Sequence, residues 1–234
     1  MTKSVIPAQA GIQCRVTNVT GSPLRYVTKR GRRAWLRAAL FALLCAAASL
    51  AAAPDAQTLA GPPLLAALKA GGLVLYFRHA STDFGQNDEQ MTGYENCARQ
   101  RNLTDAGRAE ARAIGAAIAR LGVPVGEVLA SPFCRTMETA RLIFGRATAT
   151  PAVRGGPSSA VPADRYADLR QLLSTAPPAR TNVAIVSHGN PFRAVAGESY
   201  LAEGEAAVIR PLGEDKFRIV ARIAKDGWDS LAAP

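Results

Sequence analysis

The sequence predicts an α/β fold built on an open sheet, and two short apolar runs are the main reason. Residues 73–77 and 182–186 each have the length and composition of a buried strand. The first run leads into Arg78 and His79, and the second leads into His188. In an open α/β sheet, ligands bind in the crevice beyond the carboxyl ends of the strands. Because the chain has only 2 histidines, we interpret their common position as one shared site, against the alternative of two unrelated imidazoles.

The clearest helix signal lies between Thr104 and Gly122. Thr104 is a good N-cap, Gly122 suits the position after the last turn, and apolar residues recur between them at helical spacing. We expect the buried face of this helix to consist of Ala106, Ala109, Ala113, Ile114, Ala117, Ile118 and Leu121.

A second helix is predicted over residues 133–144. Ser131 is expected as its N-cap and Pro132 at its first helical position. Arg135 then falls in the first turn, where the helix dipole does not favour a cation. This placement favours an anion that binds the guanidinium and the free backbone N–H groups together.

The other predicted elements alternate along the chain. They are a helix at 64–69 after a Pro-Pro turn, a long polar loop at 82–101, a strand at 127–130, a loop at 145–163, helices at 164–173 and from Pro191, and a hairpin of strands 206–210 and 217–223 joined through 213–215.

The positive charge of the chain is concentrated at its N-terminus. The formal net charge is +10, but residues 1–53 hold 8 basic residues and no acidic one. The remainder, with 20 basic and 18 acidic residues, carries +2, so the charge gives no reason to expect nucleic-acid binding.

The N-terminal segment has the order of a secretory signal. A basic cluster at 29–37 is followed by an apolar run at 38–50 and small residues at 51–53. We expect cleavage near 51–56, export to the periplasm or beyond, and a single domain over 54–234. The alternative is an uncleaved membrane anchor at 38–54, although this run is alanine-rich and short of the ~20 residues that span a bilayer.

Loss of this segment would leave two of the 4 cysteines, Cys97 and Cys134. In an oxidising compartment they could form a disulfide. Two separate buried thiols are an equal alternative, because sequence spacing says nothing about distance. Neither cysteine belongs to a Cys-x-x-Cys pattern of the kind that binds zinc.

Three motifs in chain order resemble the histidine phosphatase (phosphoglycerate mutase-like) superfamily. They are Arg78-His79, the segment 131–140 (SPFCRTMETA) and the segment 187–190 (SHGN). The resemblance covers roughly residues 70–225. It departs from the usual family pattern at Ala80, where the family has glycine. The resemblance implies a three-layer sandwich with a mostly parallel central sheet and helices on both faces.

The resemblance also implies a mechanism. His79 would be the nucleophile, phosphorylated transiently on its ring, and Arg78, Arg135 and His188 would hold the phosphoryl group. Two nearby guanidiniums favour a neutral, nucleophilic imidazole and also offset charge on the phosphoryl oxygens. No cofactor or metal is expected.

The proton donor for the leaving group remains open at the sequence level. A carboxylic acid usually does this work, and Glu203 is the first candidate because it follows the predicted helix after His188. Asp83 and Asp164 are rivals, and Asp168 is a weaker one because it falls within an ordinary amphipathic helix. Arg99 and Arg101 would widen the cationic surface if they faced the site, but exposed arginines are more often solvated.

We therefore expect an exported, metal-independent phosphatase that hydrolyses a phosphate monoester through a phosphohistidine intermediate. Its partner would be a small phosphorylated substrate, with no nucleic acid and no stable membrane insertion after signal cleavage. The alternatives are a mutase, a phosphohistidine protein phosphatase and a catalytically silent phosphate-binding module.

Overall fold

The computed structural model of the protein describes residues 58–154, 165–197 and 200–233. All of them belong to one compact unit, Pro54–Pro234. The predicted signal over 1–53 and its cleavage region lie outside the described residues, so both stay predictions. In the described part of the chain, no helix is both long and apolar enough to cross a membrane.

A six-stranded sheet forms the centre of the fold, with strand order β3-β2-β4-β1-β5-β6. The β3-β2, β2-β4 and β4-β1 pairs are parallel, while β5 and β6 are antiparallel additions at one edge. The strands are β1 Val74–Arg78, β2 Val125–Ala130, β3 Thr148–Ala149, β4 Asn182–Ser187, β5 Ala206–Gly213 and β6 Lys216–Ile223.

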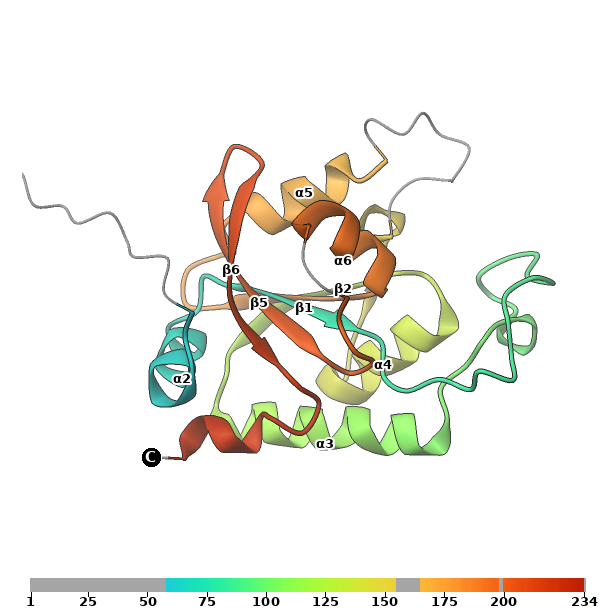
Figure 1. Cartoon of the computed structure of the whole chain (residues 1–234), viewed down its shortest axis with the longest axis horizontal. Helices are drawn as coiled ribbons and strands as arrows, with labels where there is room; N and C mark the ends of the chain where they lie inside the picture. The colour runs from blue at the N-terminus through green and yellow to red at the C-terminus, as the bar shows by residue number, and fades with distance from the viewer. Residues whose placement is uncertain (1–57, 155–164, 198–199, 234) are drawn as a thin grey trace, which may run out of the picture. The chain divides into compact units, whose positions relative to one another are not determined.

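Helices cover both faces of this sheet, as Figure 1 shows, with α3 and α4 on one side and α5 and α6 on the other. The α-helices are α2 Gly61–Ala70, α3 Asp105–Leu121, α4 Cys134–Phe144, α5 Ala167–Ser174 and α6 Gly189–Ala196. Short 3-10 turns are η1 Cys97–Arg99, η2 Pro151–Val153 and η4 Asp229–Ala232. The predicted α/β three-layer sandwich with a mostly parallel sheet is confirmed.

The core has two layers because strand side chains alternate between the faces. In β1, Leu75 and Phe77 pack with α2, α3 and α4, whereas Val74 and Tyr76 pack with α5 and α6. All four side chains are at most 1 % exposed. The apolar run of β1 is therefore continuous because both of its faces are covered.

The predicted hairpin is present, and its turn has a clear cause. Glu214 and Asp215 have φ of 50° and 57°, the left-handed pair that a tight two-residue hairpin turn requires.

The boundaries of α2 differ from the prediction. Pro62 and Pro63 lie inside the first turn of α2 rather than in a turn before it. Their lack of an N–H costs nothing there, because the first amides of a helix have no intrahelical partner.

The buried face of α3 was predicted only in part. Thr104 is the N-cap and Gly122 the left-handed residue after the helix, as expected, but Ala106, Ala109 and Ala113 are exposed. The buried face instead includes two glycines, at which the helix backbone comes close to neighbouring backbone. A Cβ on Gly107 would lie 2.1 Å from the Ser81 carbonyl oxygen, and one on Gly115 would lie 2.4 Å from that of Ile143.

Candidate active site

The sheet brings the two histidines together. Strands β1 and β4 are parallel neighbours with Arg78 opposite Ser187, so the next residue of each strand leaves the sheet at the same edge. The backbone N–H of His79 donates to the Ser187 carbonyl at 3.0 Å. The ring centroids of His79 and His188 are 5.6 Å apart. The two imidazoles therefore line one site, although they are distant in the sequence.

His79 is held in one tautomer. Its Nδ1 lies 3.0 Å from the Ala80 carbonyl oxygen. Because a carbonyl can only accept, Nδ1 carries the proton and Nε2 keeps its lone pair. The side chain is 2 % exposed, and burial, followed by the charges of Arg135, Arg78 and Arg101, lowers its pKa to about 3. At neutral pH the imidazole is uncharged and nucleophilic.

His188 is fixed by a residue to which the sequence suggested a different role. Ser131 is not the N-cap of α4, since that position is Phe133 and has no side-chain cap. The Ser131 hydroxyl instead lies 2.9 Å from His188 Nε2. Burial, then the charge of Arg135, lowers the pKa of His188 well below its usual value. Ser131, which precedes α4, thus contacts a histidine of the site instead of capping the helix.

Two arginines flank the histidines. The Nη1 of Arg78 donates to the Leu201 carbonyl at 2.9 Å. Arg135 is 5 % exposed, pairs with Asp88 at 3.0 Å and has its guanidinium 4.4 Å from the centre of the Phe133 ring. The Nε atoms of Arg78 and Arg135 are buried and have no hydrogen-bond partner in the described part of the chain. Buried donors of this kind are normally satisfied, so these two are available to a bound anion.

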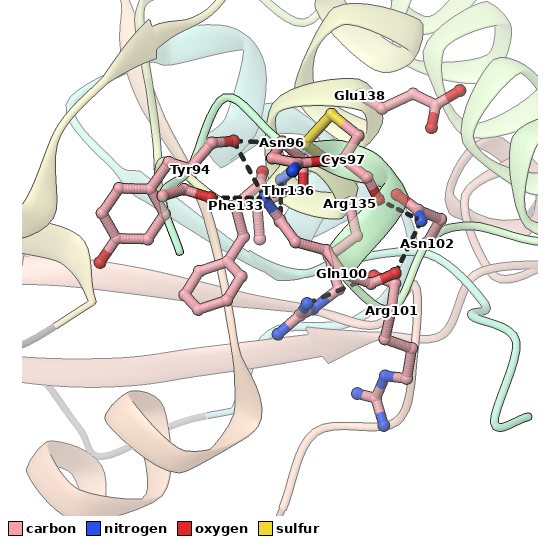
Figure 2. Close-up of a disulfide and its surroundings, with 12 residues drawn as sticks. Tyr94, Asn96, Cys97, Gln100, Arg101, Asn102, Phe133, Arg135, Thr136 and Glu138 are labelled. Carbon is pink, nitrogen blue, oxygen red and sulfur yellow. Dashed lines mark hydrogen bonds between the residues drawn. A yellow bond between two sulfur atoms is a disulfide. The ribbon is translucent and has the colours of Figure 1, made fainter. Parts of the chain in front are cut away.

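A disulfide joins the polar loop to the start of α4. Cys97 and Cys134 are bonded, which answers the question that the sequence left open. Figure 2 shows Gln100 between this bond and Arg101, whose side chain points away from the disulfide. The Gln100 side chain accepts from the Cys134 backbone N–H at 2.9 Å and donates to the Tyr94 carbonyl at 2.9 Å. The bond therefore fastens the loop to the residue next to Arg135.

Glu203 lies beside the candidate nucleophile. Its carboxylate accepts from the Thr82 hydroxyl at 2.6 Å, from the Thr82 N–H at 3.1 Å and from Arg78 at 3.4 Å. One carboxylate oxygen is 3.8 Å from His79 Nδ1. The segment that carries Glu203 is held against His79, because the Gly204 N–H donates to the His79 carbonyl at 2.9 Å.

The rival carboxylates lie elsewhere. Asp83 caps its own loop by accepting from the Gly85 N–H at 2.8 Å. Asp168 is exposed on α5. Asp164 lies outside the described residues. Of the described candidates, Glu203 is the one that contacts Arg78 and approaches His79.

The histidines and arginines of the site open onto a cavity of about 350 Å³. Five arginines line it, namely Arg78, Arg101, Arg135, Arg154 and Arg165, together with both histidines and the rings of Phe133, Tyr166 and Tyr200. The N-terminal residues of α6, from Gly189 to Pro191, also line it, and a helix N-terminus favours anions. Arg99, by contrast, is exposed and pairs with Gln90 outside this cavity.

Sequence reasoning left Arg101, Arg154 and Arg165 out of the site. Arg101 follows the disulfide-fastened loop, and Arg154 and Arg165 flank residues 155–164 in the sequence. No spacing rule relates these positions to the strand ends.

Gly189 makes room for the Tyr200 ring. A Cβ there would lie 2.0 Å from the Tyr200 ring. That ring in turn lies 5.1 Å from the Arg78 guanidinium. The glycine after His188 therefore lets an aromatic side chain close one wall of the cavity over Arg78.

Comparison with known families agrees with this geometry. Residues 74–155 match the family model described as histidine phosphatase superfamily (branch 1). Over these residues the chain is similar to this superfamily. The matched segment contains Arg78, His79 and Arg135, while His188 and Glu203 lie beyond it. This match supports phosphoryl-group chemistry of the phosphatase or mutase type.

The solved structures that resemble this chain are distant in sequence. SixA from Agrobacterium tumefaciens is 19% identical, with a TM-score of 0.46, over 65% of this chain and 98% of that one. The protein histidine phosphatase SixA complexed with tungstate is 18% identical, with a TM-score of 0.44, over 65% and 97%. A phosphoserine phosphatase mutant from Entamoeba histolytica, in complex with phosphoserine, is 12% identical, with a TM-score of 0.46, over 66% and 98%. No curated protein matches the chain.

Proposed function

We propose that this protein hydrolyses a phosphate monoester through a phosphohistidine intermediate on His79, without a metal ion. The observation that carries the proposal is the orientation of His79. Its Nδ1 is engaged by the Ala80 carbonyl, which leaves the Nε2 lone pair free in a cavity lined by Arg78 and Arg135.

The proposed reaction has two steps, transfer of the phosphoryl group to His79 and its hydrolysis. Nε2 attacks phosphorus, the ester P–O bond breaks, and the leaving oxygen takes a proton from a carboxylic acid, for which we propose Glu203. A water molecule then attacks phosphorus, the N–P bond breaks, and the resulting carboxylate takes the proton of that water. Arg78, Arg135 and His188 hold the phosphoryl oxygens while charge spreads over them.

Export remains part of the proposal. An oxidising compartment agrees with the disulfide between Cys97 and Cys134, and the order of charges and apolar residues in 1–53 favours a cleaved signal. N-terminal sequencing of protein recovered from the periplasm should begin near 51–56. Recovery of the protein in the membrane fraction with residues 38–54 intact would favour the anchor instead.

The catalytic proposal is tested by trapping the intermediate. Purified protein should release phosphate from p-nitrophenyl phosphate, and a rapid quench should leave an acid-labile, alkali-stable phosphoryl group on the protein. With only 2 histidines in the chain, His79→Ala and His188→Ala assign it. His79→Ala should abolish both turnover and labelling, whereas His188→Ala should retain a trace of label on His79.

Four outcomes would replace the proposal. Transfer of the phosphoryl group to a second hydroxyl instead of water would indicate a mutase. Activity confined to phosphohistidine peptides would indicate a protein phosphatase. Phosphate binding without turnover would indicate a binding module. Strong inhibition by EDTA would contradict the metal-independent mechanism.

A further inference from the structure

The cavity holds more positive charge than one phosphoryl group requires. Among the five arginines that line it, Arg78 pairs with Glu203 and Arg135 pairs with Asp88. The other three have no ion-pair partner among the residues that the structure describes. With both imidazoles neutral, these three leave a surplus of three charges. A phosphate monoester dianion compensates two of them, so at least one charge remains.

Arg154 is built into the wall of the cavity. It follows the η2 turn, which is fixed because the Ser187 hydroxyl donates to the Val153 carbonyl at 2.8 Å. Its guanidinium lies 5.2 Å from the centre of the Phe133 ring and 5.9 Å from that of Tyr94. It is also close enough to His188 to help lower the pKa of that imidazole. Arg154 is therefore held at the site by the end of β4 and by two rings.

Arg165 reaches the cavity from another direction. It immediately precedes Tyr166, the N-cap of α5, and its guanidinium lies 5.4 Å from the centre of the Tyr166 ring. Its Nε is buried and has no hydrogen-bond partner among the described residues. A buried guanidinium N–H without a partner is costly unless a ligand satisfies it.

We infer that Arg154 and Arg165 bind a second anionic group of the substrate, a phosphate or a carboxylate, apart from the phosphoryl group that is transferred. This inference rests on the proposed function and specifies its substrate class as phosphate monoesters with at least one further negative charge. The cavity of about 350 Å³ is within the range for small organic ligands. The rings of Tyr166 and Tyr200 supply walls for the part of the substrate between its two anionic groups.

The test compares substrates that differ by one anionic group. Glycerol 3-phosphate against 3-phosphoglycerate adds a carboxylate, and fructose 6-phosphate against fructose 1,6-bisphosphate adds a phosphate. For at least one pair, kcat/KM of the wild type should be about 10- to 100-fold higher for the member with the added group, the range expected for a charge-assisted hydrogen bond.

Arg154→Gln and Arg165→Gln should each reduce this ratio about tenfold or more. The ratio is insensitive to loss of folded protein, because both members of a pair are measured on the same preparation. Arg99→Gln removes an exposed arginine outside the cavity and should leave the ratio unchanged.

Failure of the inference is distinguishable from failure of the proposed function. Equal kcat/KM within both pairs, or arginine variants that lower both members equally, would overturn the second-anion site while leaving the phosphatase intact. If the wild type turns over none of the four compounds, titration calorimetry on His79→Ala decides the inference. Tighter binding of the member with the added group, lost in Arg154→Gln, supports it, and equal binding overturns it.

Discussion

At the scale of single residues, the two nitrogens of His79 have different partners, and this difference defines the proposed chemistry. The Ala80 carbonyl engages Nδ1. The main chain of Ala80 is itself held, because its N–H donates to the Thr139 hydroxyl at 3.1 Å. The family usually has glycine at this position, and here the methyl group is fully buried. The substitution therefore fits the packing without disturbing the carbonyl that selects the tautomer.

The lowered pKa of His79 leads to a prediction about pH. Burial lowers this pKa to about 3, so the unfolded chain, with an ordinary histidine pKa near ~6.5, binds the proton first. Stability is thus full above about pH 6.5 and falls as the pH drops towards 3, by about 1.4 kcal/mol per pH unit for this histidine. His79→Asn should remove this contribution and leave the one that the lowered pKa of His188 makes, measured by urea unfolding at several pH values.

A direct reading of the same property comes from NMR of histidine-labelled protein. The chain has 2 histidines, and His188→Asn assigns their signals. Neither imidazole should titrate between about pH 8 and 5. A His79 signal with a midpoint near ~6.5 would contradict the buried, neutral nucleophile.

Glu203 is predicted to act on the leaving group. Glu203→Gln should lower hydrolysis of an alkyl phosphate by about 10²- to 10⁴-fold, but should affect p-nitrophenyl phosphate much less, because nitrophenolate leaves without a proton. Steady-state rates on both substrates check this, with Asp83→Asn as the matched control that changes neither. Equal losses on both substrates would mean that Glu203 only positions Arg78 and Thr82.

The residues differ in how well the sequence could reveal them. Arg78, His79 and His188 stand at the ends of apolar runs, and Arg135 stands in the first turn of a helix, so local patterns place them at the sheet edge. Ser131 was misassigned as a cap because Ser-Pro is an ordinary helix start, and only the fold shows that its hydroxyl reaches His188. Arg154 depends on a hydrogen bond between distant segments, which no local pattern encodes.

At the scale of elements, the polar loop over 83–101 and helix α4 act as one unit. The disulfide joins them, Gln100 caps the Cys134 N–H, and Arg135 donates to the Arg101 carbonyl at 3.3 Å. Asp88 on the same loop pairs with Arg135. The orientation of this guanidinium therefore depends on the position of the loop.

Loss of the disulfide should consequently weaken both stability and phosphate binding. The bond closes a separation of 37 residues, for which the entropy of the unfolded chain gives about 3–4 kcal/mol of unfolding free energy. Urea unfolding and KM, measured with and without dithiothreitol, check this. The Cys97→Ser/Cys134→Ser variant should resemble the reduced wild type and ignore the reductant. Full reduction with no change in unfolding or KM would contradict the coupling.

Helix α3 shows which element properties a sequence can predict. Its limits followed from Thr104 and Gly122, since caps are local. Its buried face followed only in part, because alanine tolerates either environment and three of the predicted alanines are exposed. The rotation of the helix was decided instead by Gly107 and Gly115, where the backbones of Ser81 and Ile143 come too close for a side chain.

At the scale of the whole molecule, the site stands where separate layers of the fold meet. Strands β1 and β4 supply the histidines, α4 supplies Arg135, and the segment before β5 supplies Glu203. The fold class followed from the two buried strands because a parallel sheet needs helical cover on both faces. The antiparallel pair of β5 and β6 was predicted separately, from two strand-like runs joined by a short turn.

This convergence predicts that a bound anion stabilises the whole domain. Inorganic phosphate at 100 times its Kd should raise the unfolding free energy by about 2.7 kcal/mol, and the melting temperature by about 5–10 °C at the ~2–4 °C per kcal/mol typical of this size. The reason is that the ligand binds only when the strand ends and α4 are assembled. Differential scanning fluorimetry against phosphate concentration measures the shift.

Arg135→Gln should abolish this shift in melting temperature, whereas Arg99→Gln, outside the cavity, should retain it. A shift of equal size in all three proteins would show a general salt effect, and the anion would then not be held by the residues that converge at this edge of the sheet.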